Sequence, residues 1–262
     1  MNNNVMEMFS LKGKVALVTG GSGKYGKQIV LALAQAGAKV YNASRNLEKN
    51  QEYSAKLKEE GYEVIAETVD QGDEQSILAL KDRLVAKEGK VDILVNNSVL
   101  RTMTGYHDTA EAFTESMKIN ATGIFIFTRE FAELMAANGG GSIINISSYM
   151  GSFGPDDTLY RNVSFTAYTN PDYFFHKAGM NNLTRFAASY YGPKNVRVNA
   201  LGLGGLFNNQ DELFVERYND RTFLKRMAND TDIMGAIVYL ASDASAYLTG
   251  VILPIDGGYT AK

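Results

Sequence analysis

The sequence of 262 residues contains no cysteine, two histidines and four prolines. The absence of cysteine excludes disulfides, thiolate metal sites and cysteine nucleophiles. His107 and His176 are far apart in the sequence and do not form a zinc-binding pattern, so we expect no metal site. The chain also lacks a basic surplus, because its net charge is −3, and this argues against a nucleic-acid partner.

Long hydrophobic runs are absent as well. No segment reaches the roughly 20 apolar residues that a membrane helix requires, so we expect no membrane association. Residues 1–10 are mixed and carry no basic region of the secretory type, which makes the cytoplasm the expected location. We find no Pro/Ser-rich linker, repeat or low-complexity tract, and therefore expect one domain over residues 1–262.

Strand and helix patterns alternate from one end of the chain to the other. Short apolar runs such as Val15-Ala16-Leu17-Val18-Thr19 are typical of strands buried on both faces. Alternation with helices implies right-handed βαβ units, and so an α/β fold with a Rossmann-like, doubly wound parallel sheet of about seven strands and helices on both faces. We expect strands at 15–19, 40–43, 64–69, 92–96, 142–146, 196–200 and 251–255, and helices at 25–36, 47–60, 76–87, 111–137 and from the Tyr173 region to 191.

Two long irregular stretches, 151–172 and 202–230, interrupt this alternation. Each follows the carboxyl end of a strand, which is where α/β sheets bind ligands. Loops of such length in a compact domain are usually lids or binding loops. We expect both to contact the substrate.

A glycine-rich turn lies between the first strand and the first helix. Glycines there let the backbone approach a pyrophosphate, and the N-terminus of the following helix offers free N–H groups and partial positive charge. The alternative is a plain connecting turn. We expect a dinucleotide cofactor, held at this turn by Gly20, Ser22, Gly23, Lys24, Tyr25 and Gly26.

The end of the second strand distinguishes between two cofactors. An acidic residue there binds a ribose 2′-hydroxyl, whereas an arginine can pair with a 2′-phosphate. The chain reads Ser44-Arg45-Asn46, which favours NADP(H) over NAD(H), and Lys24 adds a second cation. The alternative is that Arg45 is a solvated surface charge.

Tyr173 and Lys177 follow Ser148 and stand four residues apart. On a helix this spacing places the phenol and the ammonium on one face. An ammonium beside a phenol favours the phenolate, so the phenol can exchange a proton with a carbonyl or alcohol oxygen. The spacing alone is common, but the glycine-rich turn and Asp256-Gly257-Gly258 accompany it here. The combination predicts an active site.

With these motifs taken together, the chain resembles the short-chain dehydrogenase/reductases, in their single-domain form, over nearly its whole length. The matching segments occur in the family's order: Thr19 to Gly26, Asp70, Asn96-Asn97, Asn120, Ser148 with Gly151, Tyr173 and Lys177 followed by Ala178-Gly179, Arg197-Val198-Asn199-Ala200, and Asp256-Gly257-Gly258.

The resemblance implies roles for these residues. Tyr173 is the general acid/base, Lys177 assists it and binds the nicotinamide ribose, and Ser148 orients the substrate carbonyl. Asn120 holds a water in a proton relay. The implied cofactor contacts are Asp70 at the adenine, together with Asn97, Tyr173 and Lys177.

The chain also departs from the family pattern. Lys24 occupies the place of the second turn glycine, Val99 that of the glycine after Asn96-Asn97-Ser98, and Leu203-Gly204 that of Pro-Gly. The segment between Ser148 and Tyr173 is longer than usual. None of these changes removes a catalytic group, so we expect altered turn geometry and a distinctive substrate.

The two long loops suggest what that substrate is. Their side chains are polar, unlike the apolar lining expected for steroids or acyl chains. We expect a polyhydroxylated carbonyl or alcohol, such as a keto-sugar or sugar acid, with Arg101 or Arg161 pairing with an anionic group. The alternative is that these residues only solvate the loops. The set comprises Arg101, His107, Asp156, Asp157, Tyr160, Arg161, Asn162, Tyr168, Asn170, Asn208, Asn209, Gln210 and Asp211.

Other functions share the same motifs. A nucleotide-sugar epimerase or dehydratase also uses the Tyr/Lys pair, but it usually has a larger C-terminal substrate domain than this chain can hold. A non-catalytic NADP sensor of the same fold is the other alternative. The resemblance further implies a homo-oligomer, a homotetramer or a dimer, with contacts through the 111–137 helix and the Tyr173 helix.

Overall fold

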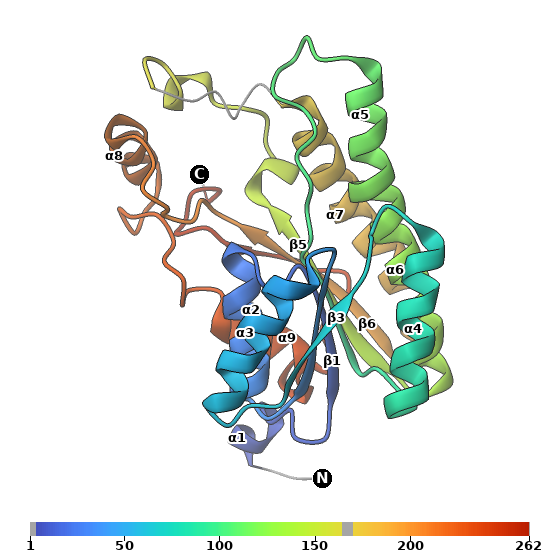
Figure 1. The fold of residues 1–262 in the computed structure, drawn as a ribbon. Coiled ribbons are helices and arrows are strands. Elements are labelled where there is room, and N and C mark those ends of the chain that lie inside the picture. Colours follow the sequence, from blue (N-terminus) through green and yellow to red (C-terminus); the bar gives the residue numbers. More distant parts are fainter. Residues whose placement is uncertain (1–3, 164–169, 262) are drawn as a thin grey trace.

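The computed structural model describes residues 4–163 and 170–261. Its centre is a parallel sheet with the strand order β3-β2-β1-β4-β5-β6-β7 (Figure 1). The chain reverses its direction of growth between β1 and β4, which is the switch point where such sheets bind ligands. The strands are β1 Val15–Thr19, β2 Lys39–Ser44, β3 Val64–Thr68, β4 Ile93–Asn96, β5 Gly141–Ser148, β6 Val196–Leu203 and β7 Ile252–Ile255.

Helices cover both faces of the sheet, as Figure 1 shows. One apolar cluster joins the strands to α2, α3 and α9, and a second joins their other faces to α4, α6 and α7. The central strands β1, β4 and β5 are buried along almost their whole length because both of their faces are covered. The helices are α1 Val5–Met8, α2 Lys24–Gln35, α3 Leu47–Glu59, α4 Glu74–Glu88, α5 Ala110–Met117, α6 Gly123–Ala137, α7 Pro171–Tyr191, α8 Glu212–Arg221 and α9 Met234–Ala241.

The predicted doubly wound sheet is confirmed, but the predicted helix at 111–137 is not one regular helix. A π-helical turn, Lys118–Thr122, separates α5 from α6 and contains Asn120. The carbonyl of Ile119 in this turn accepts a hydrogen bond from Gln71 Nε2 at 2.9 Å. The apolar pattern did not reveal the turn because it continues on both sides. Such turns often mark functional sites.

The two predicted loops are also partly regular. β5 and β6 run on to Ser148 and Leu203, because these residues still pair with each other across the sheet. The stretch 202–230 contains α8, and short 3₁₀ turns occupy Tyr149–Gly151 and Asp157–Leu159. No helix in the described part of the chain is both long and apolar enough to cross a membrane.

Candidate active site

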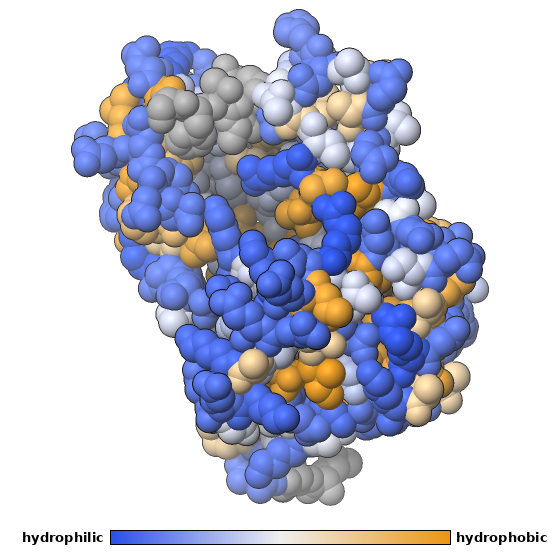
Figure 2. Space-filling view, viewed as in Figure 1, coloured by the Kyte–Doolittle hydropathy of each residue, from blue (hydrophilic) through white to orange (hydrophobic). Residues whose placement is uncertain are grey.

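The carboxyl ends of β1 to β6 surround a cavity of about 970 Å³. Figure 2 shows a hollow at this end of the molecule, between the part that carries α8 and the part that carries α5. Every residue predicted to bind the cofactor lines the cavity: Gly20, Ser22, Gly23, Lys24, Tyr25, Gly26, Ser44, Arg45, Asp70, Asn97, Tyr173 and Lys177.

The glycine-rich turn is packed against its own helix. A Cβ on Gly26 would lie 2.1 Å from the carbonyl oxygen of Gly20, and Gly20 itself has a φ of +67°. Both positions therefore require glycine. α2 begins at Lys24 with Gly23 as its N-cap, so the unpaired N–H groups of its first turn face the cavity. Lys24 is helical, a conformation open to any residue, and this explains how lysine replaces the family's glycine.

Asn97 also lines the cavity, and its hydrogen bonds hold the glycine-rich turn in place. Its Nδ2 donates to the carbonyl oxygens of Thr19 and Gly20 at 2.9 and 3.0 Å. Its backbone N–H donates to Thr19 Oγ1 at 3.0 Å. Val99, two residues on, does not have a positive φ, so the loop needs no glycine at that position. The two strand-end loops thus form one rigid wall.

Three cations gather where β2 ends. Lys24, Arg45 and Lys49 are exposed and line the cavity, and none of them forms an ion pair with a described carboxylate. Beneath them, Asn50 Oδ1 accepts from Ser22 and Ser44 at 2.8 and 2.9 Å. This hydroxyl network holds the strand end and the glycine-rich turn together. Lys49 was missed from the sequence, where it reads as one of several charges on a polar helix.

The buried Lys177 occupies the other end of the cavity. It is 3% exposed, and its Nζ donates to the carbonyl oxygen of Ile146 at 2.6 Å. Burial, with a contribution from the nearby Arg101 guanidinium, lowers the pKa of this ammonium to about 7. Lys177 can therefore change its protonation state near neutral pH.

Tyr173 and Ser148 lie beside Lys177 on the cavity wall. The Lys177 Nζ is 5.6 Å from the centre of the Tyr173 ring, and the Arg101 guanidinium carbon is 4.9 Å from it. Ser148 is the last residue of β5, and its Oγ accepts from Met150 N at 3.2 Å. The structure thus brings together the three groups that the sequence predicted as a reaction centre.

Asn120, the fourth predicted catalytic residue, lies behind the wall of the cavity. It is 2% exposed. Its Oδ1 accepts from Leu100 N at 2.9 Å, and its Nδ2 donates to the carbonyl oxygen of Leu100 at 2.6 Å. The second Nδ2 hydrogen goes to Ser116 Oγ at 3.1 Å. Both amide hydrogens are used, so only the acceptor groups of Asn120 are left to meet a water.

The predicted polar substrate set is largely wrong, because most of its members bond to other parts of the loops. Asp156 pairs with Arg221 at 2.6 Å and Asp157 with Arg161 at 2.7 Å. Asn170 donates to Met103 O at 2.8 Å, Asp211 caps α8, and the His107 ring packs against Tyr106. Tyr168 lies outside the described residues. Of the described members, those that line the cavity are Arg101, Tyr160, Asn208 and Gln210, whereas Asn162 and Asn209 do not.

An aromatic wall takes the place of the missing polar groups. Tyr149, Tyr160, Phe214, Tyr218 and Met227 form a buried cluster that lines the cavity beyond Ser148. Sequence reasoning missed this cluster because its members come from two connections that are far apart in the sequence, β5 to α7 and β6 to α9. One available signal was the spacing of Phe214 and Tyr218, which places both on one face of α8.

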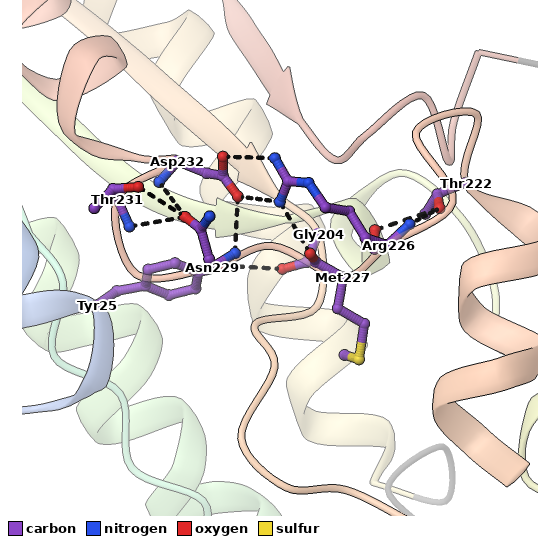
Figure 3. A network of polar contacts seen from close by, with 8 residues as sticks. All are labelled: Tyr25, Gly204, Thr222, Arg226, Met227, Asn229, Thr231 and Asp232. Carbon is purple, nitrogen blue, oxygen red and sulfur yellow. Dashed lines mark hydrogen bonds and ion pairs between the residues drawn. The ribbon is translucent and has the colours of Figure 1, made fainter. Parts of the chain in front are cut away.

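The base of the loop between β6 and α9 is fixed by a polar network (Figure 3). The Arg226 guanidinium donates two hydrogen bonds to the Asp232 carboxylate, at 2.5 and 2.9 Å. Asp232 Oδ2 also accepts a hydrogen bond from Asn229 N at 2.8 Å. Tyr25 reaches across from α2, and its phenol donates to Gly204 O at 3.4 Å. The glycine-rich turn and the loop that carries the aromatic wall therefore contact each other directly.

Comparisons with known proteins agree with this geometry. A family model described as Enoyl-(Acyl carrier protein) reductase matches residues 25–260. The 2-dehydro-3-deoxy-D-gluconate 5-dehydrogenase of Escherichia coli (strain K12) is 32% identical, over 98% of this chain and 100% of its own length. The chain belongs to the short-chain dehydrogenase/reductase family. It is an oxidoreductase that acts on alcohol or carbonyl groups with a nicotinamide cofactor.

Two further similar proteins are named for different substrates. The 7alpha-hydroxysteroid dehydrogenase of Clostridium sardiniense is 32% identical, over 96% of this chain and 95% of its own length. A crystal structure of a gluconate 5-dehydrogenase from Burkholderia cenocepacia J2315, in complex with NADP and tartrate, matches with a TM-score of 0.90 at 26% identity, over 99% of this chain and 100% of that one. The predicted family is thus confirmed, and the similarities include both a sugar-acid and a steroid enzyme.

Replacing Lys177 with methionine is expected to stabilise the protein without cofactor, and more so at pH 7 than at pH 9.5. The pKa of the buried ammonium falls from 10.5 to about 7 on folding, so the unfolded chain binds the extra proton between these values. The lysine therefore destabilises the fold fully below pH 7, and this cost shrinks as the pH rises toward 10.5. The gain from Lys177→Met should fall by about 1 kcal/mol per pH unit across this window.

Urea unfolding at the two pH values measures this difference. Lys56→Met, at an exposed position of α3, is the control and should change stability equally at both pH values. An equal gain from Lys177→Met at pH 7 and pH 9.5 would contradict the depressed pKa of the buried lysine.

Proposed function

We propose that this protein is an NADP(H)-preferring dehydrogenase that interconverts a secondary alcohol and a ketone on a polar, sugar-acid type of substrate. The observation that carries the proposal is the position of Arg101. Its guanidinium lies over the ring of Tyr173 in the cavity, and it forms no ion pair with a described carboxylate. A free cation beside the reaction centre favours an anionic substrate.

The residues at the end of β2 fit NADP(H). Lys24, Arg45 and Lys49 provide positive charge, Ser44 a hydroxyl group, and no carboxylate follows the strand where a ribose 2′-hydroxyl would need one. The glycine-rich turn is packed so tightly that a Cβ at Gly20, Gly21 or Gly26 would meet protein atoms, and such a tight turn at the start of a helix is what a pyrophosphate site uses. The gluconate 5-dehydrogenase that this chain resembles was crystallised with NADP. When bound, the cofactor supplies or accepts the hydride.

The chain's own groups handle the proton and the substrate oxygen. Tyr173 donates its phenolic proton to the oxygen during reduction and takes it back during oxidation. Lys177, whose pKa is about 7, exchanges the proton beside it. Ser148 donates a hydrogen bond to the same oxygen and stabilises its developing charge. Asn120 supports a water relay through its acceptor groups from behind the wall.

The lining of the cavity supports a hydroxylated acid as substrate. Asn208 lines the same cavity as Arg101 and carries an amide side chain, and the aromatic wall offers faces for a sugar chain or ring. Two similar proteins carry gluconate in their names, and the solved one also bound tartrate. The carboxylate is the feature that Arg101 recognises.

A second candidate substrate is a hydroxylated apolar ring of the steroid type. The aromatic wall of Tyr149, Tyr160, Phe214, Tyr218 and Met227 favours it, as does the similarity to a 7alpha-hydroxysteroid dehydrogenase. The unpaired Arg101 distinguishes the two candidates, because a neutral ring leaves this cation without a partner.

We also propose a cytoplasmic homo-oligomer, a tetramer or a dimer. Phe125 on α6 and Phe175, Phe186 and Tyr190 on α7 are large apolar side chains that are about half exposed or more. Exposed apolar side chains on two helices that contact each other favour an interface between copies of the protein. NADP(H) as a co-substrate fits a cytoplasmic location. Sedimentation equilibrium should show an oligomer that Phe186→Glu dissociates, and a monomeric wild type would contradict the proposal.

Replacing Arg45 with alanine should change the cofactor preference. Loss of a charge-assisted contact to the 2′-phosphate should lower kcat/KM for NADPH about 10- to 100-fold and leave kcat/KM for NADH nearly unchanged. Lys58→Ala, at the far end of α3, is the matched control. If Arg45 is only a solvated charge, the variant will keep the wild-type ratio between the two cofactors.

Replacing Arg101 with glutamine tests the substrate. NADPH oxidation is followed with keto-sugar acids, their uncharged amides, neutral keto-sugars and steroid ketones. Wild type should prefer the acids, and Arg101→Gln should lower kcat/KM for acids about 10- to 100-fold while sparing the amides. Tyr173→Phe should abolish all turnover and still bind NADPH. A non-catalytic sensor would have no turnover to lose.

A preference for steroid ketones, or equal losses of Arg101→Gln on acids and amides, would refute the sugar-acid proposal. Neither result would affect the membership of the family.

A further inference from the structure

A chain of buried polar groups runs behind the reaction centre, between α5 and α7. Ser116 Oγ donates to Asp172 Oδ2 at 2.6 Å, and Asn120 Nδ2 donates to Ser116 Oγ at 3.1 Å. Ser116, Asn120 and Asp172 are each at most 2% exposed. The chain thus connects the residue before Tyr173 with the predicted relay residue.

The carboxylate gives this chain a fixed direction. Ser116 has a single hydroxyl proton, and it donates this proton to Asp172 Oδ2. Its oxygen then faces Asn120 as an acceptor, and only the NH₂ end of the Asn120 amide can meet it. Asp172 and Ser116 therefore support the same orientation of the Asn120 amide that its two bonds to Leu100 require.

Asp172 lies in the first turn of α7 and forms no ion pair with a described cation. Its Oδ1 has no hydrogen-bond partner, and neither ring nitrogen of His176, one turn away on α7, has one. Burial, with the charges of Lys177 and Arg101, lowers the pKa of His176 to about 3, so the imidazole is neutral at physiological pH. A buried carboxyl group with one oxygen left without a hydrogen bond is costly to the fold. Its presence points to a role other than stability.

The chain of contacts closes on the active site. The turned Asn120 amide binds both the N–H and the carbonyl of Leu100. The next residue is Arg101, whose guanidinium lies 4.9 Å from the centre of the Tyr173 ring. Tyr173 in turn follows Asp172 on α7. The loop that carries Arg101 is thereby fixed to the same helix end as the phenol beneath it.

We propose that Ser116 and Asp172 are positioning residues: they fix the Asn120 amide and, through Leu100, hold Arg101 over Tyr173. They touch neither substrate nor cofactor. Their effect on catalysis rests on the proposed role of Arg101, whereas their effect on the loop does not depend on it.

Hydrogen exchange of the Leu100–Arg101 segment, measured without cofactor by mass spectrometry, tests the effect on the loop. Ser116→Ala and Asp172→Asn should each speed exchange there about tenfold, because the Asn120 bond to Leu100 N–H loses its support. Thr114→Ala removes a hydroxyl from the exposed side of α5 and is the matched control. The double variant should exchange no faster than Ser116→Ala, because both changes interrupt the same series of hydrogen bonds from Asp172 to Asn120.

Two further measurements separate positioning from a simple structural role. In Asp172→Asn the midpoint of urea unfolding should stay the same or rise, while kcat/KM for keto-sugar acids falls about tenfold relative to their amides. NADPH affinity should not change. A lowered midpoint with equal losses on acids and amides would show a structural role and overturn the proposal.

The outcomes also separate this proposal from the proposed function. Unchanged exchange at Leu100–Arg101 in both variants overturns the positioning role, whatever the substrate is. If exchange accelerates but Arg101→Gln does not discriminate acids from amides, the positioning role stands and the sugar-acid proposal fails.

Discussion

The hydrogen bond from the buried ammonium of Lys177 to the carbonyl oxygen of Ile146 is the contact on which the site depends. It fixes α7 against β5, and two neighbouring bonds, Ser147 to Asn181 and Asn145 to Thr184, strengthen the same contact. Ser148 ends β5 and Tyr173 lies one turn before Lys177, so this packing sets the distance between them. The lysine thus positions the phenol and the serine hydroxyl as well as supplying a group whose pKa is near neutrality.

Local sequence patterns were sufficient for the fold and for the groups that lie close together in the chain. Strand-length apolar runs, helix-ending glycines such as Gly37 and the Tyr173/Lys177 spacing each follow from one periodicity. The same patterns placed two of the three cations at the end of β2, Lys24 and Arg45, but not Lys49. In these cases the chemistry lies within a few residues of a strand end, where topology alone brings the residues together.

Features that depend on distant contacts were not predictable. The π turn at Asn120 is supported by Gln71 from the β3–α4 connection, 48 residues away in the sequence. The aromatic wall joins Tyr149 with Phe214 and Tyr218, and the acidic residues of the first loop bond to arginines instead of facing the cavity. Lys24 and Val99 depart from the family pattern without strain, because neither has a positive φ. A sequence shows which residues differ, but their backbone conformation decides whether the difference matters.

The order of the strands also separates two groups of cavity residues along the sequence. The first hundred residues, through β4, contain the glycine-rich turn, the three cations and Asp70, all on one half of the sheet. Arg101, Ser148, the Tyr173/Lys177 pair and the aromatic wall all come later in the chain. Evolution can therefore change the aromatic wall and Arg101 for a new substrate without touching the glycine-rich turn and the cations, as long as the Tyr173/Lys177 pair, which the cofactor and the substrate share, is kept.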